Sequence, residues 1–281
     1  MDMTLELLLP ILFGGGILAG FVGSLTGLGG GVIVIPLLTI VLGFDLRYAI
    51  GAALITSIAT SSGAAAAYIK ERITNIRIGM TLEIATTLGA VLGALIAMYL
   101  DKKYIAIVFG CVLIFSAART VMKKENRRDE IPASRLSKTL KLNGTYPDAS
   151  GNIVHYNVRN VAGGFSIMTL AGVLSGLLGI GSGAFKVLAM DTVMKIPFKV
   201  STTTSNFMVG VTAAASAVVY LQRGYIDPAL AMPLIVGVLS GAYLGARILP
   251  KTSVKRLRLL FGIIISLMAI LMIYNGITEN V

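Results

Sequence analysis

The sequence predicts an all-helical integral membrane protein with about ten (eight to ten) transmembrane segments. Hydrophobic residues make up 56% of its 281 positions, its mean hydropathy is +0.85, and 13% of its residues are charged, against about a quarter in soluble domains. The charges gather in short stretches, and the apolar segments between them are about 20 residues long, which suits a hydrocarbon layer about 30 Å thick. We therefore expect a multi-pass protein of the cell membrane.

The formal net charge of +11 comes from Lys and Arg residues in the stretches beside these apolar segments. In a soluble protein such an excess suggests nucleic-acid binding, but beside membrane segments it sets the topology and contacts anionic lipid headgroups. We expect membrane lipid as a partner and no nucleic acid. Cys111 is the only cysteine and lies in an apolar run, so neither a disulfide framework nor a cysteine metal site is available.

Each half of the chain has the pattern of a glycine-rich helix, a short apolar segment after a glycine cluster, and three longer helices. In the first half we place these segments at residues 5–27, 30–43, 47–69, 77–99 and 103–122. In the second half we place them at residues 161–179, 183–194, 199–221, 229–249 and 256–275. The chain then divides into a first transmembrane repeat (1–122), a linker (123–160) and a second transmembrane repeat (161–281).

The two halves also resemble each other in sequence. A shift of 152 residues aligns Ala19–Gly110 with Ala171–Gly262 without a gap. The glycines stay in register, since Gly20, Gly27, Gly29 and Gly31 fall on Gly172, Gly179, Gly181 and Gly183. Shared apolar composition alone would not keep four glycines aligned, and self-similarity at a fixed offset is the mark of an internal repeat.

Loop charges indicate how the two repeats lie in the membrane. Cytoplasmic loops carry an excess of Lys and Arg, and the central loop is rich in both, so we place it in the cytoplasm. The turn with Lys70, Arg72 and Arg77 is basic, whereas the corresponding turn holds Arg223 beside Asp227. Corresponding turns therefore prefer opposite sides of the membrane, which requires an odd number of crossings per half. The sequence thus predicts inverted repeats with both termini outside. If the short segments enter and leave by one face, the parity argument fails.

The central loop has a pattern of its own. Residues 140–158 read LKLNGTYPDASGNIVHYNV, in which alternating residues surround Asn-Gly and Ser-Gly-Asn turn signals. We expect a small cytoplasmic β-hairpin. The only histidine, His155, belongs to it, and we interpret it as a solvated side chain rather than a ligand.

The two glycine motifs resemble a known family. The sequences AGFVGSLTGLGGGVIVIP at Ala19–Pro36 and AGVLSGLLGIGSGAFKVLAMD at Ala171–Asp191 resemble the sulfite exporter TauE/SafE family, also called the toluene sulfonate uptake permease family. The following IPFKVSTTTSNFMVGVTAAASAVVYLQRGYI is similar to the family's pattern of Pro, a basic residue and Thr-Ser. The resemblance implies a prokaryotic plasma-membrane carrier of sulfite, sulfonates, thiosulfate-like ions or short organic acids. Ser182 and Leu188 depart from it, because Gly and Pro are usual there.

The glycine clusters are candidate binding sites. Consecutive glycines inside apolar sequence break a helix, and such breaks are tolerated beside protein or a water-filled cavity. Their freed N–H groups suit an oxyanion, so we select six residues as ligands: Gly29, Gly30, Gly31, Gly181, Ser182 and Gly183. Close helix packing by small residues is the alternative. A Rossmann or phosphate-loop interpretation would need a βαβ unit, which membrane helices do not supply.

Polar residues inside the apolar segments complete the candidate site. Lys186 could neutralise an anion, with a structural ion pair involving Asp191 and Lys195 as the rival interpretation. Glu83 is a candidate proton carrier if it is buried, and a hydrated position near the inner surface is the alternative. Five hydroxyl and amide residues add hydrogen-bonding groups: Thr56, Ser57, Thr204, Ser205 and Asn206. They could instead bond within the helices.

These patterns predict a secondary transporter that carries a small anion by alternating access. An anion channel and a membrane subunit of a larger permease are the alternatives. Catalytic motifs such as His-Glu-x-x-His, or Gly-x-Ser-x-Gly with a partner histidine, do not occur in the sequence, so we expect no enzyme, no cofactor and no metal site. A coupling proton or sodium ion and a homo-oligomer are compatible with the sequence.

Overall fold

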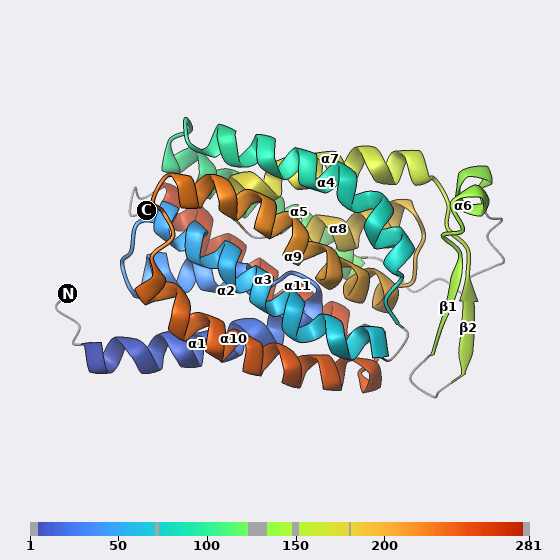
Figure 1. The fold of residues 1–281 in the computed structure, drawn as a ribbon, viewed down its shortest axis with the longest axis horizontal. Helices are drawn as coiled ribbons and strands as arrows, with labels where there is room; N and C mark the ends of the chain where they lie inside the picture. The colour runs from blue at the N-terminus through green and yellow to red at the C-terminus, as the bar shows by residue number, and fades with distance from the viewer. Residues whose placement is uncertain (1–4, 71–72, 123–133, 148–151, 180, 278–281) are drawn as a thin grey trace.

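Figure 1 shows a bundle of long helices with a two-stranded hairpin at one end. The computed structural model describes residues 5–70, 73–122, 134–147, 152–179 and 181–277. The first half contains α1 (Leu5–Thr26), α2 (Gly31–Pro36) with the π-helical turn η1 (Leu37–Val41), α3 (Leu46–Lys70), α4 (Ile76–Ala97) and α5 (Lys102–Met122). The second half contains α7 (Val161–Leu178), α8 (Gly183–Leu188) with the π-helical turn η2 (Ala189–Val193), α9 (Phe198–Gln222), α10 (Pro228–Ile248) with the 3-10 turn η3 (Leu249–Lys251), and α11 (Val254–Ile277). Every segment expected from the sequence is helical.

Six helices of the described residues are long and apolar enough to cross a membrane. They are Leu7–Thr26, Leu46–Ala65, Ile76–Ala97, Val161–Leu178, Phe198–Gln222 and Pro228–Lys251. Gly31–Val41 and Lys103–Phe115 are shorter apolar helices. The prediction of a helical, multi-pass membrane protein is therefore confirmed, while the number of about ten crossings stays a prediction.

Left-handed backbone conformations separate α1 from α2 and α7 from α8. Gly27 and Gly29 have φ angles of 77° and 76°, and Gly179 and Gly181 have φ angles of 69° and 66°. A Cβ atom makes this conformation costly, which is why glycine is the usual residue where a helix ends in this way. Ser182 adopts it too, with a φ of 52°. The glycine register of the sequence thus reflects two equivalent chain breaks.

Long helices of opposite halves pack in pairs. α1 packs against α10, α4 against α7, α3 against α9, and α5 against α11. Glycines allow these close approaches: a Cβ atom on Gly20 would overlap the Val238 carbonyl oxygen, and one on Gly172 would overlap the Thr86 carbonyl oxygen. The two contacts are related by the 152-residue offset, since Gly20 corresponds to Gly172 and Thr86 to Val238.

Two buried tyrosines repeat this relationship at the level of single hydrogen bonds. The Tyr68 hydroxyl donates to the Ser24 carbonyl oxygen at 2.7 Å, and the Tyr220 hydroxyl donates to the Gly176 carbonyl oxygen at 3.4 Å. Both pairs join the third helix of a half to the first. Equivalent residues therefore make equivalent contacts in the two halves.

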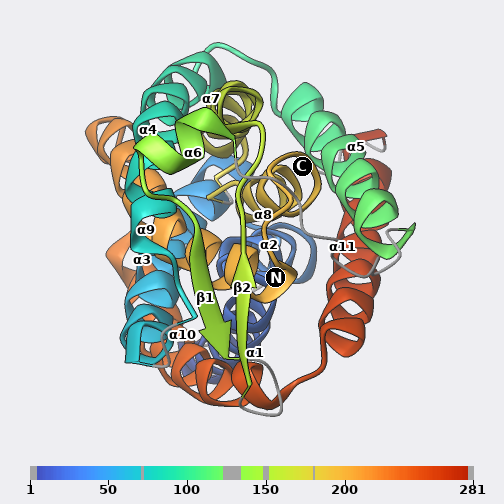
Figure 2. The same ribbon diagram turned by 90° about the vertical axis from the view of Figure 1, so that its right-hand side faces the viewer.

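The hairpin lies across one end of the bundle (Figure 2). It pairs β1 (Gly144–Pro147) with β2 (Ile153–Tyr156) in antiparallel register, with Gly144 opposite Tyr156, and a short helix, α6 (Arg135–Thr139), precedes it. The prediction of a small hairpin within residues 140–158 is confirmed. His155 is exposed. Residues 123–133 and 148–151 of the predicted linker lie outside the described residues.

Asn75 joins the hairpin end to the helices. Its side-chain oxygen accepts from Ile78 N at 3.1 Å and caps α4. Its side-chain nitrogen donates to the Leu142 carbonyl oxygen at 2.9 Å and to the Tyr156 hydroxyl at 2.7 Å. The start of α4 therefore lies against the hairpin end. In Figure 1, α7 also begins beside the hairpin, whereas α1 begins at the opposite end of the bundle.

The glycine contacts can be tested with a matched pair of substitutions. A Cβ atom on Gly93 would overlap the Val173 carbonyl oxygen, whereas one on Gly14 would meet no atom within 4 Å. Both glycines lie inside helices, so alanine improves helix propensity equally at both positions. We expect Gly93→Ala to lower the free energy of unfolding by about 1–3 kcal/mol through overpacking. Gly14→Ala should not lower it. Equal thermal unfolding midpoints of the two purified variants in detergent would contradict this packing.

Candidate functional site

The two glycine breaks face each other at the centre of the candidate site. A Cβ atom on Gly31 would lie 3.1 Å from the Gly179 carbonyl oxygen, and one on Gly183 would overlap the Gly27 carbonyl oxygen. These contacts again correspond through the 152-residue offset. The close approach explains why residues 31 and 183 carry no side chain, so the packing interpretation of the clusters is correct for these two glycines.

Ser205 links the two breaks. Its hydroxyl oxygen lies 2.8 Å from the Gly27 carbonyl oxygen and 3.2 Å from the Gly183 carbonyl oxygen, so its single proton is shared between these two acceptors. Gly30 N donates to the Thr60 hydroxyl at 3.0 Å. These bonds satisfy backbone groups that the broken helices leave open. Ser205 is thus placed beside both glycine motifs, where it binds the protein's own backbone.

Two serine hydroxyls beside the breaks lack a hydrogen-bond partner in the part of the chain that the structure describes. They belong to Ser57 and Ser182, which are both buried. Ser57 Oγ lies beside the positions that Cβ atoms of Gly29 and Gly31 would occupy, at 3.2 and 3.0 Å. Since buried polar groups are normally hydrogen-bonded, these hydroxyls are donors available to a ligand.

The other predicted polar ligands, Thr56, Thr204 and Asn206, form hydrogen bonds within the protein. Thr56 donates to the Ala53 carbonyl oxygen at 3.0 Å, and Thr204 accepts from Asn75 N at 3.1 Å. Asn206 donates its side-chain N–H to the Ser24 carbonyl oxygen at 2.6 Å, and its Oδ1 is without a partner among the described residues. Thr56 and Thr204 are therefore held in structural bonds, whereas Asn206 keeps a free acceptor.

Lys186 and Glu83 form a buried ion pair between the two halves. Lys186 Nζ lies 3.4 Å from Glu83 Oε2, and both side chains are almost fully enclosed. The hydrated position considered for Glu83 is therefore wrong. The ion pair considered for Lys186 exists, but its partner is Glu83 of α4. Asp191 is buried and interacts elsewhere, and Lys195 is exposed.

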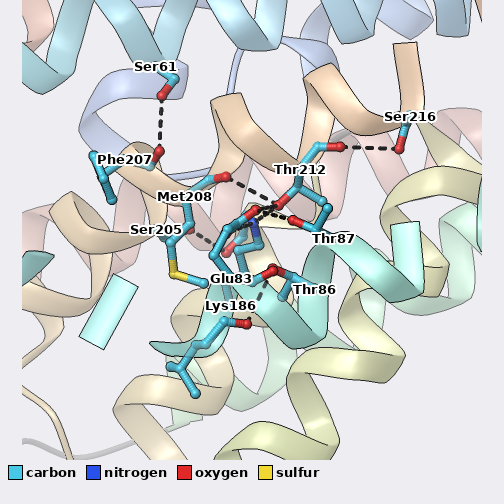
Figure 3. A network of polar contacts seen from close by, with 12 residues as sticks. Ser61, Glu83, Thr86, Thr87, Lys186, Ser205, Phe207, Met208, Thr212 and Ser216 are labelled. Atoms are coloured by element: carbon cyan, nitrogen blue, oxygen red, sulfur yellow. Dashed lines mark hydrogen bonds and ion pairs between the residues drawn. The ribbon is translucent and has the colours of Figure 1, made fainter. Parts of the chain in front are cut away.

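Two threonines complete this polar cluster and were not selected from the sequence. The Thr212 hydroxyl of α9 accepts a hydrogen bond from Lys186 Nζ and donates to Glu83 Oε1. The Thr87 hydroxyl of α4 donates to Glu83 Oε1 at 3.2 Å. Figure 3 shows these side chains converging. Thr212 lies two helical turns after Ser205, on the same helix face. This spacing in the sequence could have indicated Thr212 as a further polar residue of the site.

Among the described residues, no group of three or more His, Cys, Asp or Glu side chains could hold a metal ion. The structure brings together the glycine breaks, serine hydroxyls and Lys186, whose charge is balanced by Glu83. Such groups bind and release an ion through hydrogen bonds and charge.

Comparison with known proteins decides the family. The model of the sulfite exporter TauE/SafE family matches residues 12–272. The chain belongs to this family. It is 29% identical to the probable membrane transporter protein YunE of Bacillus subtilis over 269 residues, which cover 93% of this chain and 96% of YunE. It is 25% identical to the probable membrane transporter protein MJ0441 of Methanocaldococcus jannaschii over 288 residues, which cover 97% and 98% of the two chains. No solved structure matches the chain.

These TauE/SafE matches extend across both halves of the chain. The probable membrane transporter protein YdhB of Bacillus subtilis is likewise 27% identical over 256 residues, covering 89% of this chain and 93% of YdhB. The predicted family resemblance is thus confirmed. The family and the apolar helices agree on a multi-pass membrane protein.

The ion pair predicts a specific pattern of stabilities. Lys186→Met leaves the Glu83 carboxylate buried without a cation, which we expect to cost about 3–5 kcal/mol. The double variant Lys186→Met with Glu83→Gln buries no unpaired charge and should recover most of this loss. Thermal unfolding in detergent measures both. Lys195→Met, at an exposed lysine, is the control. If the loss in the double variant equals the sum of the losses in Lys186→Met and in Glu83→Gln alone, the two residues are not coupled.

Proposed function

We propose that this TauE/SafE protein is a secondary transporter that carries a small anion across a prokaryotic plasma membrane by alternating access. The observation that supports it best is the pair of buried, unpartnered hydroxyls of Ser57 and Ser182 beside the two glycine breaks. Hydroxyl donors in a dry site bind an oxyanion without bringing a second charge into the membrane. Sulfite, the substrate in the family's description, and sulfonates, thiosulfate and short carboxylates all have the required oxygen acceptors.

The proposed binding site joins the two breaks to Lys186. Lys186 follows Gly183 by one turn, and its backbone N–H donates to the Ser182 carbonyl oxygen at 3.0 Å. One short segment therefore carries both a free hydroxyl and a cation. The corresponding position of the first half is Val34, so the binding site is asymmetric and weighted toward the second half.

Alternating access would follow from inverted repeats, which rock against each other around a central site. Three observations support the inversion: α1 and α7 begin at opposite ends of the bundle, equivalent residues make equivalent contacts between halves, and corresponding loops differ in charge. The excess of Lys and Arg in the central loop supports a cytoplasmic hairpin. The related proteins of Bacillus subtilis and Methanocaldococcus jannaschii support a prokaryotic cell membrane.

Anion binding can be measured on purified protein with a panel of sulfite, thiosulfate, sulfonates and short carboxylates. We expect Ser57→Ala to weaken the binding of the preferred anion about tenfold or more, because a hydrogen bond to a charged group is worth about 1.5–3 kcal/mol. Ser62→Ala is the matched control, since Ser62 is an exposed serine of the same helix that donates to Ile58 O. Unchanged affinity in Ser57→Ala would remove Ser57 from the site, and a preference for cations would contradict the function.

The inverted orientation predicts opposite labelling of two matched turns. Asp101 lies between α4 and α5, Lys251 lies between α10 and α11, and both are exposed. In a Cys111→Ala background, a membrane-impermeant maleimide added to intact cells should label Asp101→Cys but not Lys251→Cys. Lys251→Cys should react only after permeabilisation. Labelling of both from outside would show that the halves have the same orientation. Electrical currents far above carrier turnover in liposomes would indicate an anion channel.

A further inference from the structure

The proposed transport needs the positive charge of Lys186, and in this structure that charge is already paired with Glu83. Lys186 has no exposed surface and Glu83 retains 7% of its own. Lys186 Nζ is held by Glu83 Oε2 at 3.4 Å and by the Thr212 hydroxyl. An anion that reaches Lys186 therefore meets a cation that is already neutralised by a carboxylate of the protein. Binding there is an exchange of one anion for another.

The surrounding elements offer Glu83 no second cation within the described helices. α4 packs against α7 and α9. α7 contains no charged residue, and the one cation of α9, Lys199, lies in its first turn and donates to the Pro250 carbonyl oxygen at 2.8 Å. The helix of Glu83 carries Arg77, two turns away and exposed.

The elements around Lys186 supply one further buried acid. α8 packs against α9, η2, α7 and α5. η2 contains Asp191, which is buried and has an interaction of its own. α5 carries its charged residues, Lys102, Lys103 and Arg119, in its first and last turns. Glu83 is the acid that contacts Lys186, so these two residues respond together when an anion enters.

The fold itself does not require an ion pair at this place. The repeat offset relates Lys186 to Val34 and Glu83 to Ile235. Val34 is fully buried, and Ile235 packs against the hydrophobic core. The positions that correspond to the Lys186–Glu83 pair thus hold two apolar residues, one from each half. Since well-packed apolar residues stabilise such a site at least as well as buried charges, packing does not account for the charged pair.

We infer that the transported anion displaces Glu83 from Lys186 and that Glu83 takes up one proton as it is released. This step rests on the proposed anion transport and names its coupling ion. The anion's charge is balanced by the Lys186 ammonium, and water on the open side of the site supplies the proton to the Glu83 carboxylate. No covalent bond to carbon or sulfur changes. Without the proton, the displaced carboxylate would remain buried with no cation beside it, which is strongly unfavourable.

Thr212 is positioned to accommodate the exchange. Its hydroxyl oxygen has two acceptors within reach, namely Glu83 Oε1 and the Met208 carbonyl oxygen at 3.2 Å. While Glu83 is ionised, the Thr212 hydroxyl donates to the carboxylate (Figure 3). Once Glu83 carries a proton, the hydroxyl turns to Met208 and its oxygen accepts from Glu83. Both protonation states are therefore hydrogen-bonded without movement of the helices.

The exchange keeps the buried site electrically neutral. In the empty protein the positive charge of Lys186 is balanced by Glu83. In the loaded protein it is balanced by a monovalent anion, and Glu83 is neutral. Because uncompensated charge inside the membrane is costly, both states can pass through the closed arrangement that alternating access requires. One proton therefore accompanies each monovalent anion.

Methanesulfonate is the probe that tests the exchange, because it stays monovalent over the working pH range. Its dissociation constant is measured with purified wild-type protein, Glu83→Gln and Asp191→Asn at a series of pH values. We expect wild-type affinity to rise about tenfold for each pH unit lowered while Glu83 is ionised in the empty protein, since one proton binds with each anion. Glu83→Gln should bind independently of pH, and Asp191→Asn, the matched buried acid, should keep the wild-type slope.

A second measurement does not depend on a stable variant. In weakly buffered solution, an indicator dye should report the uptake of one proton for each methanesulfonate that binds to the wild-type protein. A pH slope that survives in Glu83→Gln, or binding without proton uptake, would overturn the exchange and leave anion transport intact. If the wild-type protein binds neither methanesulfonate nor any anion of the panel above, the proposed function fails, and the exchange fails with it.

Discussion

The two glycine breaks approach each other closely, and the positions of α2 and α8 follow from that contact. In the hydrocarbon region, every backbone polar group has to be satisfied by the protein. The breaks after α1 and α7 expose such groups, and the structure satisfies them by placing the breaks against each other, with Ser205 donating to carbonyl oxygens of both. The absence of side chains at Gly31 and Gly183 makes this distance possible. Helices α2 and α8 can then begin inside the bundle.

This arrangement produces a site that is both rigid and polar. The backbone around it is fixed by close glycine contacts, while Ser57 and Ser182 retain hydroxyls without partners among the described residues. A rigid frame with unused donors is suited to binding a ligand, because little conformational entropy is lost when the ligand arrives. The buried Lys186–Glu83 pair adds two charged groups whose charges cancel. Ionisable groups inside a membrane are usually paired in this way.

Corresponding positions of the two halves carry different side chains at the candidate site. Equivalent glycines and tyrosines make equivalent contacts in both halves. Lys186 and Glu83 stand where the other half has Val34 and Ile235, so the two halves differ in charge at the candidate site. The equivalent contacts form the frame, and side-chain differences between the halves give the candidate site its charged groups.

The helices, their breaks and the hairpin could be predicted from the sequence, because these features depend on local properties. Apolar length defines a membrane helix, Gly27 and Gly179 permit a left-handed turn, and the Asn-Gly and Ser-Gly-Asn signals define a hairpin. The contacts between polar side chains, in contrast, became clear from the packing of the helices. Glu83 and Lys186 are separated by 103 residues, and Thr204 is bonded to Asn75 rather than free. Hydropathy and repeat patterns specify which segments are buried, but the pairing of polar atoms depends on how helices of different halves pack, which no local pattern encodes.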